Sequence, residues 1–525
     1  MSFQTQLLEH YHMTMKDLDR RCQPGSFSRL SRPDSLPSFQ AVIARLEKAI
    51  SRKEKTILYG DYDVDGLTST SILKMALDER GLKPGFFIPN RYREGYGLNG
   101  ERVKQFKEKG YHLIVCVDNG INAKEAVDLA HSLGMEVIAI DHHEPSEEKA
   151  NLDLLFHDRL SGFLDYPCSA ASLAYFVAST LLKRDDEYFA TLAGCAVFSD
   201  VMPLVGNNLE FAKLSLLLLR NRAYPNLMDL VPHPDVSYED ITFSLIPALN
   251  SVGRIEKDEM ATINACRFLL TPFDKEKSYQ RACQIKAINE KKKEIVKNIV
   301  FDKKQELESS HGFVMVAPSY SGLSGLFAGK LLREKNVPVL VLAPEDSDPD
   351  LLVGSIRAPL GYKFDTFLSS HASLFKAYGG HARACGVTFE KKRFYSLATL
   401  FLTECEKQAL ENTEEKEEKL PLTIEDLNKE NYDFYCRFFP FGEGFPAPTF
   451  ALSLASSAFS FTPSGKLAYA FNASKEGKAV CFSSFDTLRD PQFASFLCEG
   501  ELGLDTYQGD SKVVFRIRSL KGEKD

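Results

Sequence analysis

The chain has 525 residues, of which 44% are hydrophobic and 26% charged, with a net charge of −8. This length exceeds what one ordinary core holds, so we expect three or four domains. The composition is typical of soluble globular proteins, and no apolar run approaches the roughly 20 residues that a bilayer span needs. The acidic balance argues against coating nucleic acid by bulk charge, although a local basic groove would be enough to bind it.

The eleven cysteines are scattered and include no Cys-x-x-Cys pair. This pattern disfavours a disulfide scaffold or a zinc ribbon and favours reduced, buried thiols. Residues 1–6 lack the basic start and apolar block of a signal peptide. We therefore expect a cytoplasmic protein that does not associate with membranes.

Residues 1–50 are expected to form a peripheral helical segment broken by prolines. From Thr56 short apolar runs alternate with amphipathic segments, a pattern that predicts a doubly wound parallel α/β sheet over residues 51–274. The expected strands lie near residues 57–59, 86–88, 113–117 and 136–140. A helix is expected from about Leu67 to Glu79. In such sheets ligands bind at the carboxyl ends of the strands.

Hydrophobic spacing and composition divide the rest of the chain into helical, α/β and β-rich segments. Residues 173–219 should be mostly helical, and isoleucines at helical spacing predict a long linking helix over 275–310. Residues 311–410 resume the α/β pattern as a smaller domain. A charged run at 411–419 has the composition of a linker. Residues 420–525 are rich in turns and alternating strands, which predicts a small β-barrel or sandwich.

Acidic motifs follow the predicted strands of the first domain. They are Asp61, Asp63 and Asp65 after the first strand, Asp118 after the third, Asp141, His142 and His143 after the fourth, and Asp200 in the apolar run 192–204. Carboxylates clustered with histidine are ligands for hard or borderline divalent cations, and this many suggest two ions. Hydrolysis of a phosphate ester is therefore the first hypothesis.

Each motif alone has a simpler interpretation. The three aspartates at 61–65 could cap the following helix, and they lack the bidentate glutamate of a calcium loop. Asp118 could belong to a plain turn with Asn119 and Gly120, and His142 and His143 could be surface residues. The occurrence of all four motifs in one domain favours a metal site.

The motifs at 60–66, 117–120 and 141–143 resemble those of the DHH phosphoesterase superfamily. Five further segments resemble its RecJ group of single-strand-specific exonucleases: Pro89–Arg91, Glu94–Leu98, Asn250–Arg254, Gly379–Ala382 and Pro440–Gly444. The likeness covers nearly the whole chain from Thr56 onward. It implies a DHH catalytic domain (51–274), the linking helix, a DHHA1 domain (311–410) and a C-terminal OB-like β-barrel (420–525) that binds single strands.

The resemblance also implies roles for the acidic cluster. Two ions, Mn²⁺ or Mg²⁺, would be held with Asp118 as the bridging ligand, and would produce a hydroxide for in-line attack on the phosphate. The implied ligands are Asp63 and Asp118 for one ion, and Asp65, Asp118, His142 and Asp200 for the other. His143 would be the catalytic acid or stabilise the transition state, while Asp61 and Asp141 would support the ligands from behind.

The same resemblance implies residues that hold the terminal phosphate of the substrate. These are Arg91, Arg254, Ser355, Arg357 and His381. Arginine suits this role because its planar guanidinium binds phosphate oxygens in a bidentate manner. For any one of these arginines alone, a surface salt bridge would be the simpler interpretation.

The implied activity is 5′→3′ hydrolysis of single-stranded DNA to mononucleotides in repair and recombination, by a monomer that works with a helicase and a single-strand-binding protein. The alternatives are a phosphodiesterase for short RNA or cyclic dinucleotides and a non-catalytic single-strand-binding scaffold. The retained acidic ligands favour catalysis. Three positions depart from the family pattern: Tyr59 replaces a histidine of some relatives, Phe445 replaces an asparagine, and residues 319–323 lack the usual histidine.

Overall fold

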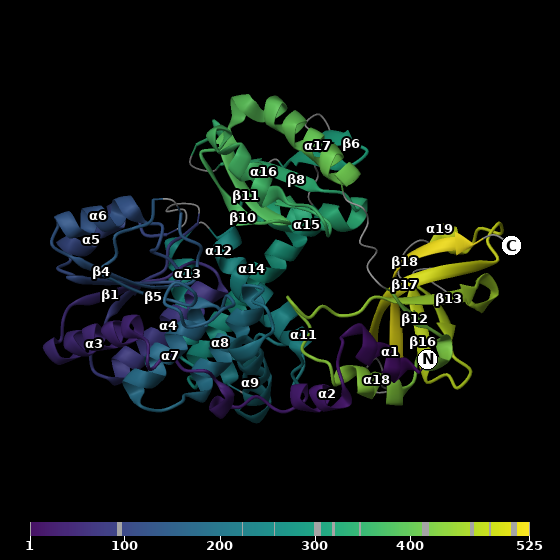
Figure 1. Cartoon of the computed structure of the whole chain (residues 1–525), viewed down its shortest axis with the longest axis horizontal. Coiled ribbons are helices and arrows are strands. Elements are labelled where there is room, and N and C mark those ends of the chain that lie inside the picture. Colours follow the sequence, from purple (N-terminus) through teal and green to yellow (C-terminus); the bar gives the residue numbers. More distant parts are fainter. Residues whose placement is uncertain are drawn as a thin grey trace. The chain divides into compact units, whose positions relative to one another are not determined.

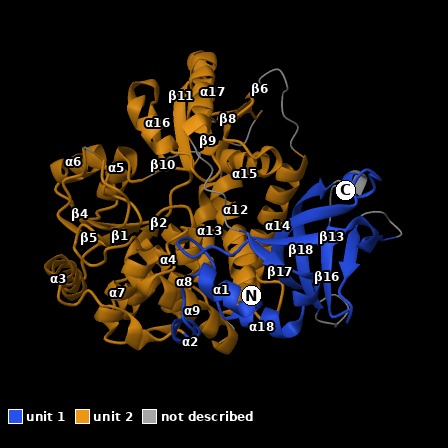
Figure 2. Cartoon of the chain, turned by 45° about the vertical axis from the view of Figure 1, so that its right-hand side comes forward, with its two compact units in different colours: residues 1–24, 416–525 blue, residues 25–415 orange. Residues whose placement is uncertain are grey.

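The computed structural model describes residues 2–91, 97–146, 148–222, 224–256, 258–298, 306–317, 321–345, 348–411, 419–462, 467–481, 485–505 and 512–523 (Figure 1). The chain forms two compact units (Figure 2). One contains Gly25–Glu415, and the other combines Met1–Pro24 with Lys416–Asp525. No described helix has both the length and the apolar character needed to cross a membrane.

The larger unit begins with a five-stranded, fully parallel sheet in the order β2-β1-β3-β4-β5. Its strands are β1 Thr56–Tyr59, β2 Gly85–Phe87, β3 Leu113–Val117, β4 Glu136–Asp141 and β5 Leu154–His157. Every residue of β1 and β3 is buried, as expected for parallel strands covered on both faces. The predicted parallel α/β sheet is therefore confirmed.

Helices cover this sheet on two sides. On β3, Val115 packs in the core beneath helices α3, α4 and α7, whereas Ile114 packs beneath α5 and α6. This separation follows from the two-residue period of a strand. The helices of this part are α3 Pro37–Arg52, α4 Val64–Glu79, α5 Gly100–Glu108, α6 Lys124–Ser132, α7 Ala170–Leu182, α8 Glu187–Ser199, α9 Gly206–Arg222, α10 Pro225–Met228, α11 Tyr238–Asp240, α12 Ile246–Ile255 and α13 Glu259–Leu269, with the short helices η1 Phe27–Arg29 and η2 Ile241–Leu245.

A long helix, α14 Lys275–Asn298, leads to a second sheet. Residues 299–305, which the sequence placed at the end of this helix, lie outside the described residues. The second sheet is mixed, has the order β10-β11-β9-β8-β7-β6, and contains one parallel pair, β7 with β8. Its elements are β6 Glu306–Ser309, β7 Gly312–Val316, η4 Ser321–Leu323, α15 Ser324–Lys335, β8 Val339–Pro344, β9 Leu351–Arg357, α16 Phe364–Ser370, η5 Ala372–Leu374, β10 Ala377–His381, β11 Ala384–Glu390, η6 Lys391–Arg393 and α17 Phe394–Glu411.

The smaller unit contains a seven-stranded mixed sheet in the order β12-β13-β17-β18-β16-β15-β14. Its elements are α1 Phe3–His10, α2 Met15–Arg21, β12 Leu420–Leu422, η7 Ile424–Asp426, α18 Lys429–Cys436, β13 Phe450–Ala455, η8 Ser456–Ala458, β14 Ser460–Phe461, β15 Ala468–Phe471, β16 Gly477–Cys481, α19 Phe485–Leu488, β17 Ser495–Asp505 and β18 Lys512–Glu523. The N-terminal helices belong to this unit because Phe3 stacks on Phe450, with ring centroids 5.8 Å apart. The sequence predicted the helices but not their partner. The predicted domain boundaries and the OB-like assignment stay predictions.

Candidate metal centre

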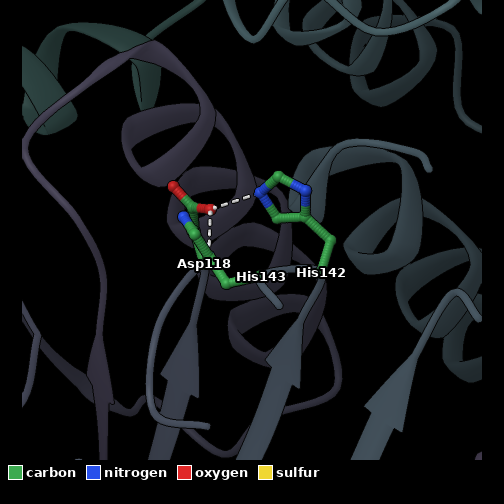
Figure 3. A group of neighbouring side chains, drawn as sticks. All are labelled: Asp118, His142 and His143. Atoms are coloured by element: carbon green, nitrogen blue, oxygen red, sulfur yellow. Dashed lines mark hydrogen bonds and ion pairs between the residues drawn. The ribbon is translucent and has the colours of Figure 1, made fainter. Parts of the chain in front are cut away.

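The acidic motifs converge at the carboxyl ends of β1, β3 and β4. Three overlapping groups place their ligand atoms within 4.8 Å of one another: Asp118 with His142 and His143, Asp65 with His142 and Asp200, and Asp61 with Asp63 and Asp118. Figure 3 shows the first group above the ends of the strands, with both imidazoles directed towards Asp118. Residues that are up to 139 positions apart in the sequence, Asp61 and Asp200, thus share one site.

Helix α4 begins inside the first motif. The sequence placed its start near Leu67, but it starts at Val64 because Asp63 is the N-cap and accepts a 3.1 Å hydrogen bond from the Gly66 N–H. A Cβ at Gly66 would lie 2.4 Å from the Asp61 carbonyl oxygen, so glycine lets the loop fold back over the helix. Asp63 is therefore both a helix cap and a member of a ligand group.

Asp65 lies in the first turn of α4 and is fully buried. Its two oxygens accept hydrogen bonds from the Ala170 and Ala171 N–H groups at the start of α7, at 2.6 and 2.7 Å. Burial and the charge of Asp63 nevertheless raise the pKa of Asp65 to about 7. Each carboxylate oxygen has a further lone pair, so Asp65 can still bind a cation.

Asp118 directly follows β3 with a φ of 65°, in the left-handed region that few non-glycine residues occupy. This backbone places its buried carboxylate 3.1 Å from the Nε2 atom of His142 and 3.9 Å from the Nδ1 atom of His143. Residues held in such strained backbone conformations cluster at functional sites. Asp118 belongs to two of the three ligand groups, as His142 does.

His142 directs one ring nitrogen at three carboxylates. Its Nε2 atom lies 3.1, 3.3 and 3.7 Å from oxygens of Asp118, Asp200 and Asp65. Burial, followed by the charge of His143, lowers the pKa of His142 to about 3, so the ring is neutral. A neutral imidazole surrounded by carboxylates is the form of histidine that binds metal ions.

The remaining carboxylates also fit a cation. Burial, together with the charges of neighbouring carboxylates, raises the pKa values of Asp61, Asp118 and Asp200. Among the described residues, the buried Oδ1 atom of Asp61 has no hydrogen-bond partner. Bringing several buried carboxylates together is unfavourable unless positive charge offsets them, and oxygen-rich sites of this kind suit Mn²⁺ and Mg²⁺.

Asp141 orients the two histidines from the end of β4. Its carboxylate accepts hydrogen bonds from the N–H groups of Ile121, His142 and His143 and a 2.8 Å bond from the His143 ring at Nδ1. Burial raises the pKa of Asp141, but the hydrogen bond and charge of His143 outweigh it and bring the pKa to about 2. Asp141 is therefore a firmly ionised anchor for His143.

His143 is about one third exposed, with Nδ1 committed to Asp141. Burial lowers its pKa, but the hydrogen bond to Asp141 and the surrounding carboxylates raise it to about 9. With Nδ1 bound to Asp141, a proton transfer by His143 would pass through its Nε2 atom. The arrangement suits a proton donor at the edge of the site.

Three arginines predicted to hold phosphate gather beside this centre. The guanidinium of Arg91 lies 5.7 Å from the ring centroid of Tyr62. Burial and the positive charges of Arg91 and Arg357 lower the pKa of Arg254, while Asp63 raises it, so Arg254 lies within electrostatic reach of both arginines and of the acidic centre. Such a concentration of positive charge suits an anion.

Ser355 and His381 belong to the second sheet. Ser355 is buried, and its Oγ atom lies 3.0 Å from that of Ser324 at the start of α15. Gly325 leaves room for Arg357, since a Cβ there would lie 3.0 Å from the guanidinium. The backbone of His381 ends β10, but its side chain lies outside what the structure describes. Its predicted role remains a prediction, and residues 92–96 of the Glu94–Leu98 motif are likewise not described.

Asn250 has a role that the sequence did not assign. Its Oδ1 atom accepts a 3.1 Å hydrogen bond from the Val64 N–H, and its Nδ2 atom donates a 3.3 Å bond to Ser199. Asn250 thereby ties the start of α4 to the end of α8, the two segments that carry Asp63 and Asp200. The sequence pointed to Asn250 only through its place in the segment Asn250–Arg254, which resembles a family motif and also contains Arg254.

Two departures from the family pattern have structural explanations. Tyr59 is fully buried, stacks on Phe87 at 5.7 Å and donates a 3.0 Å hydrogen bond to the Gly97 carbonyl, so it packs in the core. In the smaller unit, Phe445 stacks on Tyr11 at 4.3 Å and lies 3.5 Å below the guanidinium of Arg21. The N-terminal helices therefore hold Phe445 in place.

The chain is similar to known proteins in sequence and in fold. Residues 55–198 match the DHH family, N-terminal domain. The single-stranded-DNA-specific exonuclease RecJ of Bacillus subtilis is 29% identical over 436 residues, which are 79% of this chain and 54% of that protein. The RecJ protein of Escherichia coli is 27% identical over 455 residues, covering 79% of this chain and 78% of that one. The chain thus spans about half the length of the Bacillus relative.

Solved structures share the fold. The crystal structure of RecJ in complex with Mn²⁺ from Thermus thermophilus has a TM-score of 0.75 at 22% identity, covering 94% of this chain and 72% of that one. A crystal structure of exonuclease RecJ bound to manganese has a TM-score of 0.59 at 24% identity, covering 72% and 97%. Both likenesses support the same architecture.

Proposed function

We propose that this chain, a RecJ-like member of the DHH family, is a metal-dependent exonuclease that removes mononucleotides from the 5′ end of single-stranded DNA. The resemblance predicted from the motifs is confirmed by the family match and by the relatives. The observation that carries the proposed activity is the set of three overlapping ligand groups centred on Asp118 and His142.

The acidic centre would perform the hydrolysis. Asp63 and Asp118 would hold one cation, and Asp65, Asp118, His142 and Asp200 the other. Two divalent cations, Mn²⁺ or Mg²⁺, would supply an activated water and neutralise charge on the scissile phosphate. His143, anchored by Asp141, would donate a proton or a hydrogen bond as negative charge develops on the leaving oxygen.

The arginines would select the end of the strand. A terminal 5′-phosphate carries more charge than an internal phosphodiester, and three clustered guanidiniums favour the more highly charged group. Arg91, Arg254 and Arg357, with Ser355, would hold this phosphate beside the acidic centre. We propose that 5′→3′ polarity follows from this placement, with His381 as a further contact.

The smaller unit would bind the strand as an OB-like module. Tyr469 and Phe471 lie on one face of β15, and Phe471 pairs across the sheet with Lys478. Arg516 lies on the same face, since it pairs with Val480, the partner of Tyr469. Rings interleaved with cations are typical of single-strand binding, in which bases stack and phosphates pair.

The wider context of the proposal is DNA repair and recombination in the cytoplasm. A monomer that degrades only unpaired strands needs other proteins to open duplex and to present the strand. A helicase and a single-strand-binding protein are the corresponding partners. The relatives support this part of the proposal only through their specificity for single-stranded DNA.

The test is a digestion of single-stranded DNA, blunt duplex DNA and short RNA with and without Mn²⁺. We expect metal-dependent loss of the single-stranded DNA alone, abolished by Asp118→Ala. Binding without cleavage would instead indicate a scaffold, and cleavage of short RNA alone would indicate an oligoribonuclease-like phosphodiesterase. The control is Asp153→Asn. Asp153 accepts a hydrogen bond from the Val137 N–H and contacts the His131 ring, at the end of β4 opposite to the acidic centre.

A further inference from the structure

The helix that carries Asn250 and Arg254 extends well beyond the acidic centre. Segments α11, η2 and α12 run on as one helix, since Asp240 and Leu245 at the joints have right-handed helical backbone angles. Residues Ile241–Leu245 form a π-helical turn. Such turns are rare and occur frequently at functional sites.

One face of this helix is only partly buried, and it becomes exposed at Phe243. Within α12 the residues that keep solvent exposure are Pro247, Asn250 and Arg254, while the others are buried. Steps of three and four residues place these side chains on one face. Phe243 lies four residues before Pro247 and is 72% exposed, so it continues the same face. Phe243 is about 16 Å along the helix from Arg254.

The segment that packs against this helix also exposes an apolar side chain. The hydrogen bond from Asn250 to Ser199 and the contact of the Phe198 and Tyr238 rings at 5.8 Å join the end of α8 to the helix. Val201, directly after Asp200, is 62% exposed and has a φ of 54°. A β-branched residue is strained in that region, and here it ends α8, since the Met202 N–H bonds back to the Val197 carbonyl.

We propose that Phe243 is a stacking platform for a base of the DNA strand, located a few nucleotides from the bond that is cut, with Val201 in contact with the strand beside Asp200. This inference rests on the proposed function and adds a specific contact to it. Single exposed apolar residues are common on protein surfaces. Phe243 differs because its helix face leads through Asn250 to Arg254, the residue proposed above to hold the 5′-phosphate.

A base-dependent assay tests the platform. The substrates are a 5′-phosphorylated thymidine oligomer and the same oligomer with abasic residues in place of the second to fifth nucleotides. For each we would measure KM and kcat with Mn²⁺, and affinity by fluorescence anisotropy without metal. The variants are Phe243→Ala, Phe243→Trp and the control Phe273→Ala, whose side chain is 70% exposed on a different segment, after α13.

Stacking of one base contributes about tenfold or more in affinity. We expect Phe243→Ala to raise KM for the intact strand by about that factor and to leave the abasic strand unchanged, with kcat preserved. Phe243→Trp and Phe273→Ala should behave as the wild type. Equal effects of Phe243→Ala on both strands, or no effect, would overturn the proposal.

Failure of the proposed function can be distinguished from failure of the platform. If the wild type cuts neither strand, the anisotropy comparison still decides whether affinity depends on bases through Phe243. A difference between intact and abasic strands that disappears in Phe243→Ala supports the platform. Identical affinities of wild type and Phe243→Ala for the intact strand contradict it.

Discussion

Replacing Asp141 with asparagine isolates the positioning of the histidines from metal ligation. Asp141 belongs to none of the three ligand groups, yet it accepts four hydrogen bonds, three of which come from the two histidines. Asparagine has the same size but no charge, and its amide can accept only on one side. The change therefore removes the anionic partner of His143 and leaves the ligand set intact.

Two magnitudes follow for Asp141→Asn. Folding lowers the pKa of Asp141 from 3.8 to about 2. The ionised form therefore adds about 2 kcal/mol of stability to the metal-free protein above pH 4, which is lost as the pH falls through about 2. Loss of a partner that supports metal-bound histidines typically costs about 10- to 100-fold in activity or metal affinity. We expect both effects.

Denaturant unfolding at pH 7 would measure the loss of stability, and kcat with Mn²⁺ the loss of activity. Without Asp141, the pKa of the His143 ring should fall towards its ordinary value. As the pH is raised, the ring should therefore lose its proton, and the enzyme its activity, at a lower pH than in the wild type. The control Asp153→Asn changes an aspartate that also bonds a histidine and a backbone N–H. Activity and a pH profile equal to the wild type in Asp141→Asn would refute this reasoning.

Three further predictions concern other parts of the structure. Asn250→Ala should weaken Mn²⁺ binding by about tenfold in calorimetry, because the segments carrying the ligands are no longer tied together; unchanged affinity would contradict this role. Metal-free protein should become more stable as the pH falls from about 8.5 to about 6.5. In that range the folded protein takes up protons that the unfolded chain does not, because folding raises the pKa of His143 to about 9 and that of Asp65 to about 7. Below about pH 6.5 His142 has the opposite effect on stability, because folding lowers its pKa to about 3 and only the unfolded chain takes up this proton. Thermal scans should show this slope without metal and not with Mn²⁺; a slope of the opposite sign would contradict it. Phe445→Ala should destabilise the smaller unit by about 2 kcal/mol through loss of its ring and guanidinium contacts, and a midpoint in urea equal to the wild type would contradict that value.

The sequence predicted the local structure best where burial is continuous. The expected strand 113–117 coincides with β3 Leu113–Val117, because five apolar residues in a row suit a strand covered on both faces. The start of α4 was placed three residues late, since carboxylates were taken as loop ligands although Asp63 also caps the helix. The convergence of the acidic side chains was predictable because strand ends in a parallel sheet share one edge.

Contacts between distant segments could not be predicted from local patterns. The packing of Phe3 on Phe450 and of Tyr11 on Phe445 depends on tertiary structure that periodicity does not encode. The role of Asn250 likewise depends on the backbone of Val64, 186 residues away. The resemblance to a family indicated that this segment matters, but the structure was needed to propose how.

The central claim is hydrolysis from the 5′ end of a single strand at the acidic centre. The most direct measurement follows the products of one oligonucleotide labelled separately at its 5′ and 3′ ends, with Mn²⁺, for the wild type and Asp118→Ala. With the wild type, we expect the 5′ label to appear at once as a mononucleotide and the fragment that carries the 3′ label to shorten progressively. Asp118→Ala should release neither label. Early release of the 3′ label as a mononucleotide would contradict hydrolysis from the 5′ end. Release of the 5′ label by Asp118→Ala at the wild-type rate would contradict hydrolysis at the acidic centre.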